Sequence, residues 1–390
     1  MKDTKNFKLG NVLTVSIAHL VHDTYSSFLA PILPLLIAKF SISLSLAGFL
    51  SVMGRLPSLF NPIVGLLADK ISVRYFIIIA PSITSVSMSL LGIAPSYILL
   101  ALLVFIMGVS STLFHVPAPV MIKHVSGNRV GKGMSFYMLG GELARTLGPV
   151  VILAAVSWWG LEGTFRLIPF GITASMVLYL RVRNIRISDD FKKNDKKTSL
   201  NKTFGKFMTI FIIVAGITFF RGFMRAALTT FLPTYLNLVR EETIWISGIS
   251  LSLIQFSGAV GTFFCGSLSD RIGRKFTLLL ISIVSPVFMA LFLLFDGFFT
   301  IPLLILMGFS LAATTPVILA MLQELDSDRP AFINSIFMSI SFLLGAIDTM
   351  IVGLLGDTIG LENTYRVSVL LAVGAIPFIL KLKDPRGKSS

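Results

Sequence analysis

The sequence predicts an all-α membrane protein with twelve transmembrane helices in two six-helix, pseudo-symmetric halves. Of its 390 residues, 54% are hydrophobic and only 13% are charged, and the mean hydropathy is +0.86. Soluble domains carry roughly 25% charged residues. From Tyr75 to Ile122, 48 residues pass without Asp, Glu, Lys or Arg, whereas one span needs only about 20. A segment rich in glycine and charge also occurs twice, which predicts two similar halves.

Hydropathy and turn residues place six spans on each side of a polar linker. We expect an N-terminal half over residues 1–182, a lysine-rich cytoplasmic linker over 183–206, and a C-terminal half over 207–390. The expected spans cover about 11–38, 44–68, 75–93, 97–122, 134–158 and 164–182 in the first half, and about 207–238, 244–269, 276–295, 300–322, 331–353 and 364–380 in the second.

The basic residues predict the orientation in the membrane. On alternate loops and termini, 25 Lys and Arg residues fall on one side and 4 on the other. By the positive-inside rule, both termini and the linker are cytoplasmic. This asymmetry explains the net charge of +14 better than nucleic-acid binding does, so no nucleic-acid partner is expected.

The repeated segment lies on two of these cytoplasmic loops. Its second copy runs from Gly266 to Lys275, and its first copy begins at Gly65; the aspartates Asp69 and Asp270 are 201 residues apart. Glycine permits a tight turn, and each aspartate can pair with a nearby arginine or helix N-terminus. We expect the segment to act as a conformational latch, or alternatively only to mark orientation. The residues concerned are Gly65, Asp69, Lys70, Arg74, Gly266, Asp270, Arg271, Gly273 and Arg274.

Two six-helix halves with this loop after the second helix of each half resemble the major facilitator superfamily. The pattern Gly-x-x-x-Asp-Arg-x-Gly-Arg-Lys is met in full from Gly266 to Lys275, while the first copy lacks the second glycine and one basic residue. The resemblance implies the major facilitator fold and alternating access around a site near the bilayer midplane.

Ionisable residues inside the predicted spans are costly and mark candidate sites. In the first span, His19, His22 and Asp23 stand at i, i+3 and i+4 and therefore share one helical face. A buried carboxylic acid between imidazoles is a plausible proton carrier. The alternative is a satisfied hydrogen-bond cluster that fixes the helix.

Acidic and further basic residues also lie within other spans. The fifth has Glu142 and Arg145, the seventh Arg221 and Arg225, and the eleventh Asp348. The resemblance implies an Asp23–Arg145 pair in one half and an Arg225–Asp348 pair of reversed sign in the other. The pairs either open and close with protonation or are static, and Glu142 and Arg145 can also neutralise each other.

Polar residues elsewhere in the spans are the candidate substrate contacts. His115 precedes Pro117 and Pro119, which disturb the helix backbone, and arginines outnumber acids in the spans, which favours an anionic or zwitterionic solute. The imidazole of His115 either contacts substrate or caps a freed carbonyl. The full set is His115, Arg55, Arg221, Arg225, Gln255 and Tyr25.

Several stretches are similar to the fosmidomycin-resistance type of drug exporter within that superfamily. They are Ser16 to Asp23, Phe114-His115, and Ser126-Gly127 to Gly148-Pro149 through Gly140-Gly141. The second half matches less clearly. The resemblance implies a drug/proton antiporter that exports small anionic compounds, with a proton- or ion-coupled importer of a small organic metabolite as the alternative.

Enzymatic function is not expected, because the chain lacks His-Glu-x-x-His and Gly-x-Ser-x-Gly motifs. Its single cysteine, Cys265, excludes a multi-cysteine metal site, and neither a metal nor a cofactor is expected. The expected partners are a small-molecule substrate, protons and the lipid bilayer. We expect a monomer in the cell inner membrane, crossing it many times.

Overall fold

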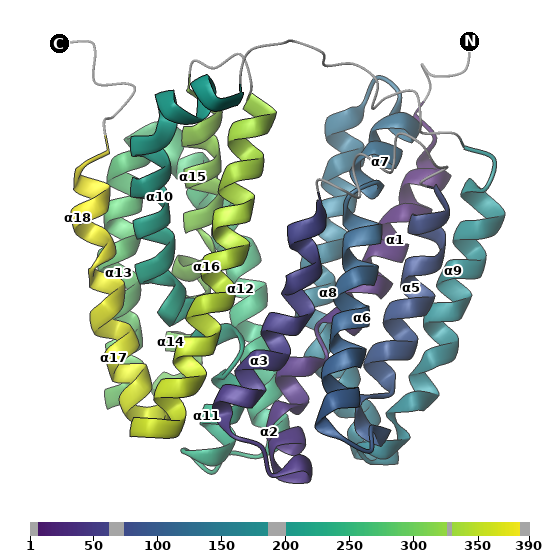
Figure 1. Cartoon of the computed structure of the whole chain (residues 1–390), viewed down its shortest axis with the longest axis horizontal. Coiled ribbons are helices and arrows are strands. Elements are labelled where there is room, and N and C mark those ends of the chain that lie inside the picture. Colours follow the sequence, from purple (N-terminus) through teal and green to yellow (C-terminus); the bar gives the residue numbers. More distant parts are fainter. Residues whose placement is uncertain (1–6, 62–73, 186–199, 326–329, 383–390) are drawn as a thin grey trace. The chain divides into compact units, whose positions relative to one another are not determined.

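Helices make up nearly all of the chain that the computed structural model describes, namely residues 7–61, 74–185, 200–325 and 330–382, and no strand occurs there (Figure 1). The chain divides into two units, one from residues 1–42 and 50–195 and the other from residues 43–49 and 196–390. The all-α prediction is therefore confirmed. Most of the expected linker, together with Gly65, Asp69 and Lys70, lies outside the described residues.

Eleven helical segments in the described chain are long and apolar enough to cross a membrane. A shorter apolar segment, Leu44–Phe60, corresponds to the expected second span, whose later part lies outside the described residues. Together these segments account for the twelve predicted spans.

The first half of the chain contains helices α1 to α9, in which the first and fourth spans are each broken into two helices. The first breaks after Ser26 and the fourth at Val116-Pro117, where proline lacks an amide hydrogen and cannot continue the ladder. The helices are α1 (Leu9–Ser26), α2 (Leu29–Phe40), α3 (Leu44–Arg55), α5 (Arg74–Ser89), α6 (Tyr97–His115), α7 (Ala118–Ser126), α8 (Val130–Trp159) and α9 (Ile168–Val182).

The second half repeats this pattern, with the equivalent first and fourth spans again broken. The helices are α10 (Leu200–Thr229), α11 (Leu232–Leu238), α12 (Ile244–Ile272), α13 (Arg274–Leu294), α14 (Thr300–Ala312), α15 (Thr314–Gln323), α16 (Pro330–Ile359), α17 (Leu361–Val373) and α18 (Ala375–Leu380).

Matched backbone features confirm the internal repeat. Ser41 and Glu241 both have positive φ, of 49° and 55°. Lys39 donates to the Gly92 carbonyl and Arg240 to the Phe292 carbonyl, each at 2.5 Å. Each feature recurs after 200 or 201 residues, so the two halves share their local construction.

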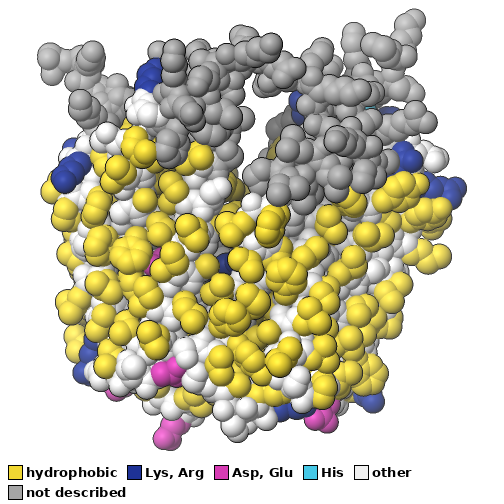
Figure 2. Space-filling view, in the orientation of Figure 1, with side chains coloured by type: hydrophobic (Ala, Val, Ile, Leu, Met, Phe, Trp, Pro, Cys, Tyr) yellow, Lys and Arg dark blue, Asp and Glu magenta, His cyan; other side chains and the backbone are white. Residues whose placement is uncertain are grey.

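Each half buries its own apolar core and exposes apolar side chains. In the first half Val15, Ile77 and Phe114 are fully buried together, and in the second Val214, Leu278 and Phe337 are buried. Trp158 is 74% and Phe263 74% exposed, and hydrophobic side chains are spread over the described part of the face seen in Figure 2. A surface of this kind fits lipid rather than water.

Gly160 and Gly360 end α8 and α16 with φ of 73° and 79°. A Cβ at either position would meet nothing within 4 Å, so alanine there adds only backbone strain, about 1–3 kcal/mol. We predict that Gly160→Ala and Gly360→Ala each lower the thermal unfolding midpoint in detergent. Gly205→Ala in α10, also in open space, is the control and should not. Equal unfolding midpoints for all three variants would contradict the left-handed backbone conformation of Gly160 and Gly360.

Candidate functional site

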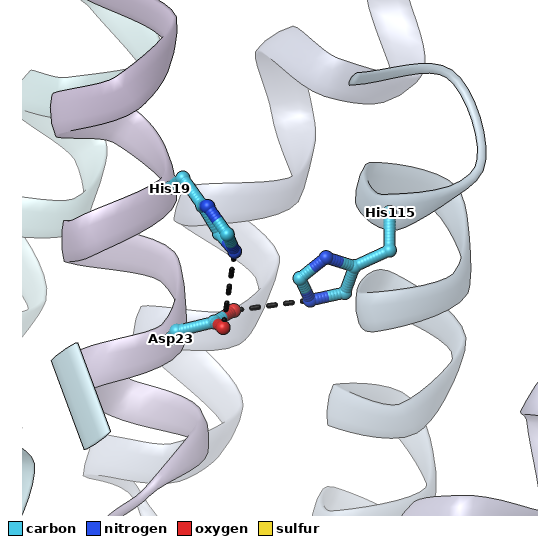
Figure 3. Close-up of side chains that lie close together, drawn as sticks. All are labelled: His19, Asp23 and His115. Carbon is cyan, nitrogen blue, oxygen red and sulfur yellow. Dashed lines mark hydrogen bonds and ion pairs between the residues drawn. The ribbon is translucent and has the colours of Figure 1, made fainter. Parts of the chain in front are cut away.

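The predicted face of α1 forms the centre of a polar cluster in the first half. His19 is 5% exposed and His22 is fully buried, while the side chain of Asp23 is 15% exposed. Figure 3 shows Asp23 between His19, one turn earlier on α1, and His115 at the end of α6. The i, i+3, i+4 spacing therefore places the side chains of His19, His22 and Asp23 together on α1, as expected.

Asp23 is approached by three imidazoles. Its Oδ2 lies 3.1 Å from His19 Nε2, and its Oδ1 lies 3.0 Å from His115 Nε2 and 4.0 Å from His22 Nε2. His115, expected as a substrate contact, is thus part of the Asp23 cluster; its side chain is 37% exposed. That exposure leaves it able to meet a solute as well.

The contact between His19 and Asp23 requires a proton. His19 Nδ1 lies 2.8 Å from the Tyr137 carbonyl oxygen, which can only accept, so Nδ1 carries a hydrogen. In a neutral imidazole Nε2 then carries a lone pair, which would face the lone pairs of Asp23 Oδ2. The hydrogen bond therefore forms only when His19 is an imidazolium or Asp23 is protonated. Either form holds one proton between the two atoms.

Aromatic rings enclose this cluster. Tyr137 of α8 stacks on His19 with a centroid distance of 4.0 Å, and Phe114 of α6 stacks on His22 at 4.7 Å. The Tyr137 hydroxyl also lies 3.3 Å from His115 Nδ1. Sequence reasoning missed Tyr137, although it precedes Gly141 by four residues and Arg145 by eight, on one face of α8.

Glycine on α8 makes room for His19. A Cβ on Gly141 would lie 2.6 Å from His19 Cε1, closer than atoms approach without displacement. The sequence therefore brings α8 onto α1 at the level of the cluster, where the Tyr137 carbonyl can accept from His19.

The cluster also has the spacing of a metal site. One ligand atom from each of His19, Asp23 and His115 lies within 4.8 Å of the others. Two imidazole nitrogens next to one carboxylate can equally share protons, so the spacing alone does not distinguish a metal site from a proton site.

The expected ion pair between Asp23 and Arg145 is not formed in the structure. Arg145 Nη2 instead lies 2.5 Å from Glu142 Oε1 on the same helix, with side chains 45% and 29% exposed. Imidazoles occupy the space around Asp23, and a carboxylate one turn away on α8 satisfies Arg145. Glu142 and Arg145 thus neutralise each other, as the alternative expected.

In the second half, Arg221 is 4% exposed and points at α13. Its Nη1 donates to Ser285 Oγ at 3.1 Å and to Ser282 Oγ at 3.2 Å, while its Nη2 is buried without a hydrogen-bond partner. A buried guanidinium held by hydroxyl groups keeps its positive charge uncompensated by these contacts.

Asp348 of α16 is fully buried and lies directly against Gly222 of α10. Gly222 is three residues before Arg225, so Asp348 packs on the face of α10 that carries Arg225. The Arg225–Asp348 pair stays a prediction, and the packing favours it.

The other substrate candidates differ in how deeply they are buried. Tyr25 is 4% exposed and its hydroxyl donates to the Leu167 carbonyl, so that group is occupied. Arg55 ends α3 and Gln255 lies in α12, and both are half-buried.

The second copy of the repeated segment is a helix junction. Gly273 alone separates α12 from α13, with φ of 93°. The buried Arg274 side chain contacts Asp270 at 2.5 Å and Glu324 at 2.8 Å. Glu324, which sequence reasoning missed, ties α15 into this charge network, and all of its members lie in the second half. Arg74 donates to the Ile185 carbonyl at 3.4 Å, and Arg271 is exposed.

Residues 15–347 match the Major Facilitator Superfamily. The chain belongs to this superfamily. It is 26% identical over 361 residues to the fosmidomycin resistance protein of Escherichia coli (strain K12), covering 92% of this chain and 89% of that protein.

Solved structures of this superfamily share the fold. A bacterial homolog of the human lysosomal transporter Spinster, inward-facing and occupied, has a TM-score of 0.84 at 15% identity, covering 96% of this chain and 97% of that one. A D-xylose–proton symporter has a TM-score of 0.78 at 13% identity, covering 99% and 100%. Because the chain belongs to the Major Facilitator Superfamily, it is a multi-pass membrane transporter of a small molecule, not an enzyme, as the sequence predicted.

Gly222→Ala should destabilise the second half, because the added methyl group would collide with the Asp348 carboxylate. Overpacking of this kind costs about 1–3 kcal/mol. Thermal melting of Gly222→Ala, Asp348→Ala, the double variant and the wild type forms a double-mutant cycle. The penalty should shrink in the Asp348→Ala background. An equal penalty in both backgrounds would show that the two groups are not in contact.

Proposed function

We propose that this chain is a proton-coupled antiporter that exports small anionic or zwitterionic drugs by alternating access. The observation that carries the proposal is the His19–Asp23 contact, which needs one proton to exist. The name of the fosmidomycin resistance relative and the buried positive charge of Arg221 support the substrate class.

Loss of the proton would make this contact repulsive. His19 Nε2 would then present its lone pair to the ionised Asp23, in largely buried surroundings where the rings of Tyr137 and Phe114 stack on His19. Electrostatic interactions are stronger in such a medium than in water. Both side chains lie on α1, where His19 also contacts the Tyr137 carbonyl of α8 and Asp23 contacts His115 of α6. The packing of α1 on these two helices would therefore differ with and without the proton, and that difference couples proton binding to the state of the transporter.

In this proposal the two halves have different tasks. The first half takes up and releases the proton at Asp23, His19 and His22. In the second half, Arg221 and Arg225 attract the anionic group of the substrate, and Asp348 offsets part of their charge. Glu142 and Arg145, half-exposed on α8, and His115, Arg55, Gln255 and Tyr25 are further candidates for contact with solute or proton.

The orientation is also part of the proposal. Both termini lie in the cytoplasm in this proposal, because 25 basic residues fall on that side and 4 on the other. The proposed location is the cell inner membrane and the proposed state is a monomer. The Arg274–Asp270–Glu324 network then lies at the cytoplasmic ends of α12, α13 and α15, where we propose that it stabilises one conformation.

Fosmidomycin susceptibility tests the direction of transport. Expression in an Escherichia coli strain that lacks its own fosmidomycin resistance protein should raise the drug concentration that stops growth. The alternative function, coupled import, is favoured by the likeness to a D-xylose–proton symporter. Import of the drug would lower that concentration.

Asp23→Asn should abolish transport driven by a pH gradient, because an amide cannot take up the proton. The assay is uptake of labelled fosmidomycin into proteoliposomes with an acidic lumen, with and without an ionophore that collapses the gradient. Glu362→Gln, which removes an exposed ion pair with Arg366 on α17, is the matched control and should transport normally. Full activity of Asp23→Asn, or wild-type uptake indifferent to the gradient, would refute proton coupling through Asp23.

Replacement of Arg225 and Asp348 tests their pairing. Arg225→Gln or Asp348→Asn alone should reduce uptake more than the double substitution does, because a lone partner is an uncompensated charge in the membrane. Losses that simply add would argue against a pair.

A further inference from the structure

A chain of hydroxyl groups leads from His22 into neighbouring helices. His22 Nδ1 lies 3.1 Å from Thr84 Oγ1 on α5, and Thr84 Oγ1 lies 2.8 Å from Ser110 Oγ on α6. Ser110 Oγ in turn lies 2.8 Å from the Ala80 carbonyl oxygen. His22, Thr84 and Ser110 are all fully buried.

Elementary chemistry fixes the direction of every bond in this chain. The Ala80 carbonyl can only accept, so the single hydroxyl hydrogen of Ser110 is used there. Ser110 Oγ must then accept from Thr84, which uses the only hydrogen of Thr84. Thr84 Oγ1 can therefore only accept from His22, and His22 Nδ1 is a donor. In the neutral imidazole the lone pair then lies on Nε2.

His22 Nε2 is buried, has no hydrogen-bond partner, and lies 4.0 Å from Asp23 Oδ1. The titratable groups around the ring are Asp23 and His19 on α1 and His115 on α6, the last with a centroid distance of 5.6 Å. On α5, the group that contacts the His22 ring is the Thr84 hydroxyl. On α8, Tyr137 contacts His19 and His115. An imidazole beside a carboxylate would otherwise favour a hydrogen on the near nitrogen, since N–H donates to the negative oxygen.

We propose that Thr84 and Ser110 are positioning residues that hold His22 in the Nδ1–H tautomer. Nε2 is thereby kept as a second proton-accepting position next to Asp23, beside the one that the His19–Asp23 contact provides. When a proton arrives, the Nε2 lone pair forms the new N–H bond, and the resulting imidazolium lies next to the carboxylate. The inference rests on the proposed function, because it assigns the Thr84–Ser110 pair a part in proton coupling.

The tautomer can be measured without transport. The chain has four histidines, so labelling with ¹⁵N-histidine and solid-state NMR in lipid gives four pairs of ring signals, and a His22→Asn sample assigns those of His22. At a pH where His22 is neutral, wild type and Thr84→Ser should show Nδ1–H, because serine keeps the hydroxyl. Thr84→Val, which has nearly the same shape, should show Nε2–H. Ser110→Ala frees the Thr84 hydrogen to donate to His22 and should also shift the signal towards Nε2–H.

The pH profile of fosmidomycin uptake into proteoliposomes gives the functional readout. In Thr84→Val a proton would have to bind at Nδ1 against an apolar methyl group, so the midpoint should move to lower pH by about one unit, the scale of one lost hydrogen bond. Thr84→Ser should keep the wild-type midpoint.

The Nε2–H tautomer in the wild type, or Thr84→Val indistinguishable from Thr84→Ser in both measurements, would overturn the inference. If uptake responds to the pH gradient while His22 holds the Nε2–H tautomer, only the inference about Thr84 and Ser110 is overturned, and the proposed function stands. Uptake indifferent to the gradient would remove the proposed function, and with it the role given to Thr84, even where the tautomer is as expected.

Discussion

The interaction on which this structure depends most is the hydrogen bond between His19 and Asp23. The Tyr137 carbonyl fixes the hydrogen on Nδ1 of His19, so the other nitrogen can meet the carboxylate at 3.1 Å only with a proton between them. Gly141 provides the space for the ring, and Phe114 and Tyr137 cover it with aromatic carbon. The bond itself lies within α1, but His19 also contacts the Tyr137 carbonyl of α8 and Asp23 contacts His115 of α6, so one proton affects groups that touch both neighbouring helices.

The two halves share their construction but differ in their charges. The positive φ of Ser41 recurs at Glu241, and that of Gly160 recurs at Gly360. In the first half the buried groups are imidazoles around an aspartate, and each of these side chains can gain or lose a proton. In the second half Arg221 keeps its charge at any physiological pH. One half is thus suited to respond to protons and the other to present a constant positive charge.

Much of the fold could be predicted because its signals are local. Hydropathy, the repeat and the prolines near Pro117 located the spans and the break in the fourth. The i, i+4 spacing likewise placed His19 beside Asp23 correctly. Contacts between helices depend on packing that residue spacing cannot give, so Tyr137, Thr84 and Glu324 were missed. His115 was expected on substrate or on a freed carbonyl and not beside Asp23, and Arg145 was expected on Asp23, or alternatively on Glu142, which it contacts.

Proton release on substrate binding tests the central claim most directly. Purified protein in weakly buffered detergent solution would be mixed with fosmidomycin, and a pH-sensitive dye would report the protons released. If the His19–Asp23 proton is exchanged for substrate, wild type should release protons on binding, and His19→Gln and Asp23→Asn should release fewer. Binding without release in the wild type, or equal release from Asp23→Asn, would contradict the account.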